Sequence, residues 1–284
     1  MTTIAVVAMG EMGSGVARRL VERGARVVTS LGGRSAASAK RATDAGVTIL
    51  ADDATLVAEA ELLLSIVPPS AAGDTTQRFL PLIEKAARKP VYIDCNAIAP
   101  QTLHAIAKPF LDRKLPFIDG SIIGGPPRSA DGPSPRLYMS GPIANEAETL
   151  KQFGLDTRVL STSLGDASTL KMSYAGITKG SQALGSAMAL GAGRNGALES
   201  LVAELKFSQP QIYAWLAKGL PSMYDKAYRW DGEMREIAKF LLPEQGSSTM
   251  LTGAADLFQH IAADNREGPQ SEIISILNRF VAGK

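Results

Sequence analysis

The stretch TIAVVAMGEMGSGVARRLVERG, residues 3–24, decides the fold. Its first six residues are apolar and rich in β-branched side chains, which is typical of a buried strand. A glycine-bearing turn follows at residues 8–13 and leads into apolar residues at helical spacing, which end at a glycine. A strand, a glycine turn and a helix in this order predict that the chain opens with a βα unit of an α/β sheet.

Alternating strand and helix patterns continue to about residue 163. Further strands are predicted at residues 25–31, 47–50, 61–68, 90–96, 115–123 and 136–141. Nearly continuous apolar strands separated by helices indicate a parallel sheet covered on both faces. After about residue 165 only helical patterns follow, at residues 165–190, 197–207, 209–218, 222–241 and 270–281. We therefore expect a doubly wound α/β Rossmann domain over residues 1–163 and an all-helical domain over residues 164–284, entered by a long helix from about residue 165.

Composition narrows the class of protein. The 284 residues carry a net charge of +2, which is too small to indicate a nucleic-acid partner. The single cysteine, Cys95, excludes an intrachain disulfide and a multi-cysteine zinc site, and with only two distant histidines we expect no metal. The low cysteine content favours a cytoplasmic location. No uncharged apolar stretch of 18 residues occurs, and the apolar N-terminus lacks a basic region, so we predict neither a membrane span nor a signal peptide.

The turn at residues 8–13 matches the dinucleotide-binding pattern G-x-G-x-x-G except that Ala8 replaces the first glycine. Gly10 would allow the backbone to approach a pyrophosphate at the helix N-terminus, and Gly13 would let the helix pack closely on the strand. Ala8 can hold the turn if its φ is negative. The alternative is an ordinary glycine-rich βα turn. The residues expected to contact a dinucleotide here are Met9, Gly10, Glu11 and Met12.

The end of the second strand bears on the choice between NAD and NADP. NAD sites usually place a carboxylate there to bind the ribose hydroxyls. Here Ser30 and Leu31 stand at that place, no acid follows, and Arg34 and Ser35 come next in a glycine-flanked loop. A guanidinium and hydroxyl groups suit a 2′-phosphate, so we favour NADP. The alternative is that Arg34 is a solvated loop residue at the start of the next helix.

The segment SIVPPS, residues 65–70, follows the fourth predicted strand. In an open α/β sheet the carboxyl ends of the strands face the ligand crevice. We therefore expect Val67 and Pro68 to line the cofactor. The alternative is a strand that is simply ended by proline.

Four motifs, in order, resemble those of the β-hydroxyacid dehydrogenase superfamily, which includes 3-hydroxyisobutyrate dehydrogenase, tartronate semialdehyde reductase and, more distantly, 6-phosphogluconate dehydrogenase. They are IAVVAMGEMGSGVARRL (4–20), VYIDCNAIAPQT (91–102), DGSIIGGPP (119–127) and GDASTLKMSYAGITKG (165–180). The helical half, with RWDGEMREIAKFL from residue 229, is similar to a branch called phosphogluconate-dehydrogenase-like. A true 6-phosphogluconate dehydrogenase is much longer, so that activity is not assigned.

The resemblance implies a role for each motif. Lys171 corresponds to the family's catalytic lysine, which donates a proton in carbonyl reduction and accepts one in alcohol oxidation. Asn96 stands where the family has a serine, and could hold the substrate or the nicotinamide. The segment that corresponds to the family's substrate-binding motif contributes Ser121, Ile123, Gly124 and Gly125. The pattern SLGD at residues 163–166 fits a capping box, which predicts that the helix of Lys171 begins there.

Several positions depart from the family's pattern. The family's asparagine, four residues after the lysine, is Ala175, and Tyr174 is the best-placed replacement. The family's serine in the third motif is Ile123, which offers no hydroxyl. The family's second lysine is absent, and Arg229 is a candidate charge and Trp230 a candidate aromatic wall; the alternatives are a surface arginine and a helix-packing tryptophan. These departures indicate a substrate other than the standard small 3-hydroxy acid.

Small residues crowd the segment AGITKGSQALGSAMALGAG, residues 175–193, and let helices approach closely. In the family such helices bury against a second subunit, so the resemblance implies a homodimer. The alternative is close helix packing within one chain.

Three functional hypotheses remain. The first is an NADP-dependent oxidoreductase that acts on CH–OH groups of a small-molecule substrate, with Lys171 as general acid and base. The second is an imine reductase, a related family that usually has aspartate or tyrosine at the lysine position. The third is a non-catalytic dinucleotide-binding protein, of which Ala8, Ala175 and Ile123 would be the signs. Neither the substrate, nor the physiological direction, nor the stereochemistry of transfer follows from the sequence.

Overall fold

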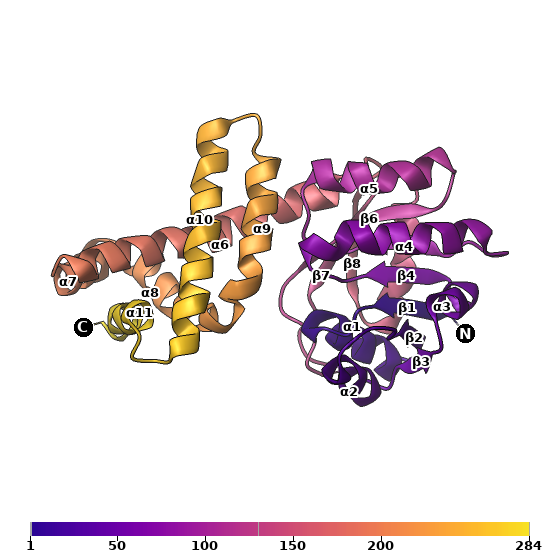
Figure 1. Cartoon of the computed structure of the whole chain (residues 1–284), viewed down its shortest axis with the longest axis horizontal. Coiled ribbons are helices and arrows are strands. Elements are labelled where there is room, and N and C mark those ends of the chain that lie inside the picture. Colours follow the sequence, from indigo (N-terminus) through magenta and orange to yellow (C-terminus); the bar gives the residue numbers. More distant parts are fainter. Residues whose placement is uncertain (1, 130, 284) are drawn as a thin grey trace. The chain divides into compact units, whose positions relative to one another are not determined.

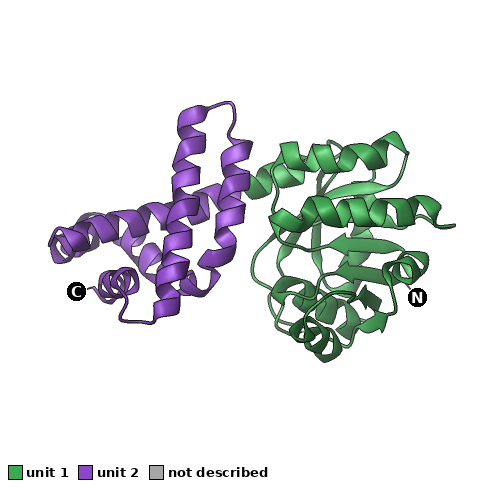
Figure 2. Cartoon of the chain, viewed as in Figure 1, with its two compact units in different colours: residues 1–172 green, residues 173–284 purple. Residues whose placement is uncertain are grey.

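The fold was analysed in a computed structural model that describes residues 2–129 and 131–283. The chain forms two compact units, Met1–Met172 and Ser173–Lys284 (Figure 2). The first is an α/β unit and the second is all-helical, so the predicted fold class is confirmed. The two compact units divide inside one long helix, α6 (Asp166–Arg194).

The first unit is built on an eight-stranded sheet with the strand order β3-β2-β1-β4-β5-β6-β7-β8. The strands are β1 (Thr3–Val7), β2 (Arg26–Ser30), β3 (Thr48–Leu50), β4 (Leu62–Ser65), β5 (Val91–Asp94), β6 (Phe117–Ile123), β7 (Arg136–Ser140) and β8 (Asp156–Ser161). Strands β1 to β6 are parallel, so their carboxyl ends share one edge. The strand order reverses between β1 and β4, which is where open α/β sheets bind ligands.

The far edge of the sheet differs from the sequence prediction. Strand β7 runs antiparallel to β6, whereas an all-parallel sheet was expected. The connection is rich in proline and glycine, and its described residues, 124–129 and 131–135, form no helix, whereas a parallel return normally needs a helical crossover. Strand β8 was not predicted, because charged residues such as Asp156 and Arg158 interrupt its apolar pattern.

Helices cover both faces of the sheet (Figure 1). Because successive side chains of a strand point to opposite faces, β1 places Ile4 and Val6 in one core and Ala5 and Val7 in the other. The first core is closed by α1 (Glu11–Glu22), α2 (Ala36–Asp44) and the 3₁₀ helix η2 (Ala144–Phe153). The second is closed by α3 (Asp53–Glu59), α4 (Ala72–Lys85), which follows the 3₁₀ turn η1 (Pro69–Ala71), and α5 (Pro100–Asp112).

The second unit contains most of α6 and the helices after it. These are α7 (Leu198–Ser208), α8 (Pro210–Gly219), the 3₁₀ turns η3 (Leu220–Ser222) and η4 (Tyr224–Lys226), α9 (Ala227–Phe240), α10 (Gln245–Glu267) and α11 (Glu272–Ala282). Helix α10 was not predicted, because its buried face includes Ser248, Ala255 and Ala262 and so gives a weak apolar signal. Among the helices that the structure describes, none combines the length and apolarity needed to cross a membrane.

The turn between β1 and α1 begins with a left-handed residue. The φ of Ala8 is 73°, so the condition stated for an unstrained alanine at this turn, a negative φ, is not met. An L-residue with a Cβ pays about 1–2 kcal/mol for this conformation. The neighbouring Gly13 meets the turn closely, because a Cβ added to Gly13 would lie 2.1 Å from the carbonyl oxygen of Ala8. Close helix–strand packing is therefore required at Gly13, as predicted for the third glycine of the pattern.

Replacing Gly13 by alanine is expected to lower the free energy of unfolding by about 1–3 kcal/mol, because the new methyl group overlaps the Ala8 carbonyl. The matched control is Gly10→Ala, since no heavy atom lies within 4 Å of the added Cβ there. Its stability is expected to stay within about 0.5 kcal/mol of the natural chain. Urea unfolding of the three proteins measures both values. Equal stability of the two variants would contradict this account of the turn.

Candidate active site

The glycine turn leaves the N-terminus of α1 accessible. Gly10 is the N-cap residue of α1, is exposed, and has open space where a side chain would be. The first N–H groups of a helix have no partner within the helix and can bind a phosphate. The side chain of Met9 is buried, so only its backbone is available to a ligand at the turn. Glu11 and Met12 are the first two residues of α1. This geometry fits the pyrophosphate of a dinucleotide.

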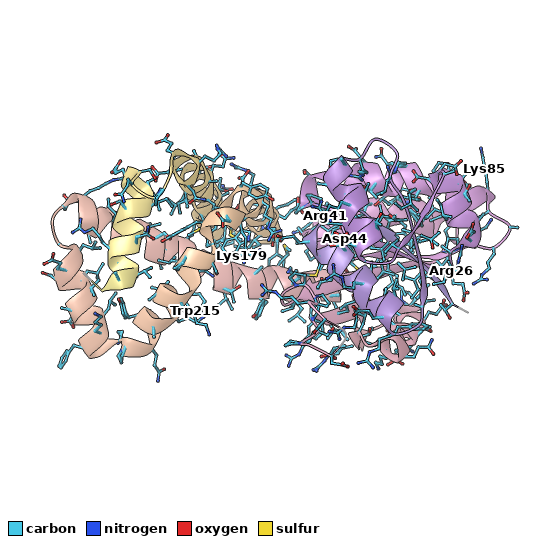
Figure 3. All side chains as sticks on the ribbon, turned by 90° about the horizontal axis from the view of Figure 1, so that it is seen from below. Arg26, Arg41, Asp44, Lys85, Lys179 and Trp215 are labelled. Atoms are coloured by element: carbon cyan, nitrogen blue, oxygen red, sulfur yellow. The ribbon has the colours of Figure 1, made fainter. Side chains whose placement is uncertain are left out.

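Arg41, which no sequence motif singled out, contacts the glycine turn. It projects from α2 (Figure 3), and its Nε donates to the carbonyl oxygen of Met9 at 2.5 Å. A second guanidinium nitrogen lies 3.5 Å from Ser38 Oγ. The N-cap of α2 is Ser35, whose Oγ accepts from the Ser38 backbone N–H at 3.3 Å, and the exposed Arg34 precedes it. The segment from Arg34 to Arg41 therefore combines hydroxyl groups, a helix N-terminus and two guanidinium groups.

A carboxylate stands beside the end of β2 after all. The hydroxyl group of Ser30 donates to Asp53, the first residue of α3. Asp53 also pairs with Arg78 at 3.2 Å, which balances its charge. The usual place for such an acid is directly after the second strand, whereas Asp53 follows β3 and reaches Ser30 through the fold.

Asn96 ties together the carboxyl ends of β4 and β5. Its Oδ1 accepts from the Val67 N–H at 2.7 Å, and its Nδ2 donates to Ser65 Oγ at 3.2 Å and to Asp94 Oδ2 at 2.8 Å. Its side chain is buried, as is that of Val67, whereas Pro68 is exposed. The amide of Asn96 thus shapes the segment that was expected to line the cofactor.

The start of α6 is capped by the sheet rather than by the predicted capping box at Ser163. Asp119 of β6 accepts hydrogen bonds from the backbone N–H groups of Gly165 and Ser168, and Ser140 of β7 accepts from that of Ala167. Ser161, rather than Ser163, donates to the Asp166 side chain, and the Ser163 N–H donates to Ser161 Oγ. The helix that bears Lys171 therefore begins on β6 and β7.

Lys171 is attached to the same strand. Its Nζ donates to the carbonyl oxygen of Ile122 at 2.8 Å, near the carboxyl end of β6, and its side chain is partly buried. That end of β6 lies on the sheet edge that also carries the turn after β1, because the two strands belong to the parallel part of the sheet. The Lys171 ammonium group and the glycine turn therefore lie along the same edge of the sheet.

The residues expected to bind substrate, Ser121 and 123–125, differ in their exposure to solvent. Ser121 is fully buried, and its hydroxyl group has no hydrogen-bond partner within the described residues. Ile123 is partly exposed, and Gly124 and Gly125 are exposed. Gly124 has a φ of 126°, and a Cβ there would lie 3.0 Å from the Cα of Pro135. The backbone of the two glycines is accessible, whereas the side chain of Ser121 is enclosed.

The loop after β6 is held down by Arg19 of α1. This guanidinium is almost wholly buried and donates to the carbonyl oxygens of Ser129, Gly132 and Gly154 at 2.5, 2.8 and 3.1 Å. Pro127 lies against α1, since a Cβ on Gly15 would be 2.9 Å from its carbonyl oxygen. The described part of this loop is thus packed beside the first turns of α1.

In the helical unit, the candidate residues separate into surface and core. Tyr174 is 49% exposed and Arg229 is exposed. Trp230 is buried, packs edge-on against Phe258 with ring centroids 5.3 Å apart, and lies under the ammonium group of Lys179 at 4.8 Å. Its surroundings are those of a helix-packing tryptophan, which was the alternative interpretation.

Lys179 also forms an ion pair that the sequence analysis missed. Its partner is Glu233 of α9, and both side chains are only 15% exposed (Figure 3 labels Lys179). Within residues 2–129 and 131–283, no three His, Cys, Asp or Glu side chains gather as a metal site.

Asp94 is a buried carboxyl group near the site whose pKa is strongly raised. It ends β5 and is paired in register with Asp119 of β6. Burial raises the pKa of Asp94 to about 7; the nearby charge of Asp119 adds to the rise, and the hydrogen bonds from Asn96 oppose it. Burial also raises the pKa of Asp119. Asp94 is therefore partly protonated near neutral pH.

Comparison with known proteins identifies the relatives of both units. Residues 3–171 match the family described as the NAD binding domain of 6-phosphogluconate dehydrogenase, and residues 192–261 match a domain of unknown function, DUF1932. An uncharacterized 28.5 kDa protein of Methanothermus fervidus is 28% identical over 91% of this chain and 98% of its own length. The 3-hydroxyisobutyrate dehydrogenase of Pseudomonas aeruginosa is 31% identical over 44% of this chain and 42% of its own.

Solved structures share the whole fold. A conserved protein of unknown function, described as structurally similar to 3-hydroxyacid dehydrogenases, is 28% identical and covers 94% of this chain and 99% of its own, with a TM-score of 0.69. The 3-hydroxyisobutyrate dehydrogenase of Mycobacterium tuberculosis with L-serine is 17% identical with a TM-score of 0.72, covering 98% of both chains. An imine reductase of Myxococcus stipitatus with NADP+ is 17% identical over 99% of this chain and 100% of its own, with a TM-score of 0.57.

The free energy of unfolding is expected to fall as the pH rises from about 5 to about 8. The folded pKa of Asp94 is about 7, whereas an unfolded aspartate titrates near about 3.9, so the folded chain keeps a proton that the unfolded chain has released. This contribution is fully present below the unfolded pKa and is lost as the pH rises through the folded one, by an amount on the order of 2 kcal/mol across this window.

Asp94→Asn removes the titrating group and should flatten this pH dependence, as measured by urea unfolding at each pH. The matched control is Asp74→Asn on α4, since Asp74 is exposed. It should keep the slope of the natural chain. An unchanged slope in Asp94→Asn would show that Asp94 does not carry the effect.

Proposed function

The chain belongs to the β-hydroxyacid dehydrogenase superfamily, a family of dehydrogenases and reductases with an NAD(P)-binding domain, and from this premise we propose that it is an NADP-dependent oxidoreductase acting on CH–OH groups. The substrate would be a hydroxy acid or alcohol, or its aldehyde or ketone. The observation that carries the proposal is the attachment of Lys171 to the Ile122 carbonyl oxygen, at the sheet edge that bears the glycine turn.

In this proposal the cofactor supplies or accepts the hydride, and the chain's own residues manage the proton and the orientation. Lys171 Nζ donates a proton to the substrate oxygen during carbonyl reduction and takes it back during alcohol oxidation. Its positive charge also stabilises negative charge that develops on that oxygen. The exposed backbone of Gly124 and Gly125 offers N–H groups to a polar substrate group in place of the family's serine hydroxyl.

The preference for NADP is supported by the segment at the start of α2. Arg34, Ser35 and Ser38 offer a positive charge and hydroxyl groups beside a helix N-terminus, a combination that favours a phosphate. Asp53 is the opposing feature, because a carboxylate beside Ser30 would suit the ribose hydroxyls of NAD. Its ion pair with Arg78 reduces that repulsion toward a 2′-phosphate.

We also propose that the protein is a homodimer, and that it works in the cytoplasm, where the free Cys95 stays reduced. The helical unit carries an apolar groove of about 740 Å³ between α6, α7, α8 and α11. On α6 it exposes Ile177 by 72%, Leu184 by 63% and Met188 by 56%, and Trp215 of α8 lines it as well (Figure 3). Spacings of seven and four residues place the three α6 side chains on one helix face. Exposed apolar patches of this kind mark protein interfaces.

The cofactor preference is testable by fluorescence titration with NADPH and, separately, NADH. The natural chain is expected to bind NADPH at least about tenfold more tightly, because a charge-assisted hydrogen bond to the 2′-phosphate is worth about 1.5–3 kcal/mol. Arg34→Ala should weaken NADPH binding alone. Arg41→Ala should weaken both, since Arg41 holds the Met9 carbonyl of the shared turn. A preference of the natural chain for NADH would refute the assignment of NADP and leave the oxidoreductase proposal standing.

The reaction is tested by screening hydroxy acids, alcohols, aldehydes and ketones with NADP or NADPH, with cyclic imines as a separate group. Lys171→Met should lower kcat by about 10²–10⁴-fold, the usual contribution of a positioned acid or base. Lys171→Arg keeps the charge but cannot release its proton, so it should be impaired as well. Turnover that survives in Lys171→Met would exclude Lys171 as the acid and base. Turnover of imines alone would favour an imine reductase.

The dimer is tested by analytical ultracentrifugation. Leu184→Glu places a charge in the apolar groove and is expected to yield monomers. The matched control is Leu111→Glu on α5, which is 47% exposed in the other unit and should sediment like the natural chain. A natural chain that is monomeric at micromolar concentration would contradict the dimer.

A further inference from the structure

We propose that Asp119 is a positioning residue for the reaction: by fixing the first turn of α6 to the sheet, it determines where Lys171 presents its ammonium group. This inference rests on the proposed function, in which Lys171 is the acid and base. Asp119 itself is fully buried and does not reach a substrate.

The carboxylate of Asp119 is used completely within the protein. Its Oδ2 accepts hydrogen bonds from the backbone N–H groups of Gly165 at 3.1 Å and Ser168 at 3.0 Å, and from Ser140 Oγ at 2.8 Å. Its Oδ1 accepts from Ser168 Oγ at 2.7 Å. Three of these four bonds come from the start of α6, so the carboxylate binds the helix rather than merely filling the core.

A cap of this kind fixes a helix in space. The first N–H groups of any helix need partners, and a negative charge at that end is favourable. A local cap would satisfy the helix wherever it lay. Here the cap comes from β6, more than 40 residues earlier in the chain, with Ser140 of β7 accepting from the Ala167 N–H at 3.0 Å. The register of α6 against the sheet is therefore set by Asp119.

Strand and helix are joined at two matching points. Asp119 binds Ser168, and three residues further along both elements the carbonyl oxygen of Ile122 binds Lys171 Nζ. An α-helix has 3.6 residues per turn, so Lys171 lies less than one turn beyond the anchored residue. A shift of Ser168 is consequently passed to Lys171 almost undiminished, and a displacement of about 1 Å in an acid or base can cost about 10²-fold in rate.

Asp119→Asn tests the inference with little change of size, because an amide nitrogen cannot accept the hydrogen bonds of the oxygen it replaces. In the screen above, kcat is expected to fall by about 10²-fold while the Kd for NADPH stays within about twofold, since the glycine turn is untouched. The matched control is Asp166→Asn. Asp166 lies at the same helix end but is exposed and bonds Ser161 Oγ. Its kcat should stay within about twofold of the natural value, because exposed groups of this kind contribute little.

A second readout is independent of turnover. The rate of acylation of Lys171 by acetic anhydride is measured by mass spectrometry, with the exposed Lys85 as internal standard (Figure 3). Asp119→Asn should loosen the helix start and raise the relative rate of Lys171 by about threefold or more, the effect of losing part of a hydrogen bond. Asp166→Asn should leave it unchanged. If no substrate is turned over by the natural chain but this rate still rises in Asp119→Asn, the positioning role stands and the proposed function fails.

Ser168→Ala covers the case in which Asp119→Asn does not fold. It removes only the hydroxyl bond to Oδ1 and keeps the backbone bonds to Oδ2. Its kcat is expected to fall about fivefold, the effect of losing one buried hydrogen bond, and its Lys171 acylation rate is expected to rise. Lys171-dependent turnover that is unchanged in Ser168→Ala, or equal in Asp119→Asn and Asp166→Asn, would overturn the inference.

Discussion

The attachment of α6 to β6 through the buried carboxylate of Asp119 is the interaction on which the candidate site depends. One strand holds the helix start through a side chain and the Lys171 ammonium group through a backbone carbonyl. The parallel strands place this attachment on the same edge as the turn after β1. Neither the lysine nor the turn would define a site alone. A sheet whose strands end together converts motifs that are far apart in sequence into one row of functional groups.

Much of the fold could be predicted from the sequence, because its signals are local. A buried parallel strand needs a continuous apolar run, and a helix needs its own periodicity, so β1 to β7 and most helices left a readable pattern. The predictions failed for elements whose sequence does not show the apolar pattern expected from their packing. Strand β8 carries charged residues at the sheet edge. The buried face of α10 mixes Leu251, Phe258 and Ile261 with small or polar residues, so neither element has a continuous apolar signal.

The candidate site was less predictable, because its contacts are long-range. Lys171 and the glycine turn were found through ordered motifs, but the bonds that place them were not. Arg41 reaches Met9 across 32 residues, and Asp119 reaches Ser168 across 49. A capping box at Ser163 was the local expectation, but the first N–H groups of α6 are bound by Asp119 and Ser140 of the sheet, and the Ser163 N–H donates to Ser161. The sign of φ at Ala8 likewise depends on how the chain leaves a strand, which residue type alone does not specify.

The strained turn at Ala8 has a consequence for the history of the gene. Alanine and glycine codons differ by one base at the second position, so a single nucleotide change would give this turn the residue that tolerates its φ of 73° without cost. The strained alanine turn and the relaxed glycine turn are therefore separated by one nucleotide substitution. Selection has tolerated the strain at Ala8 although one base change could remove it. Such tolerance is expected when a protein needs only enough stability to exceed a threshold.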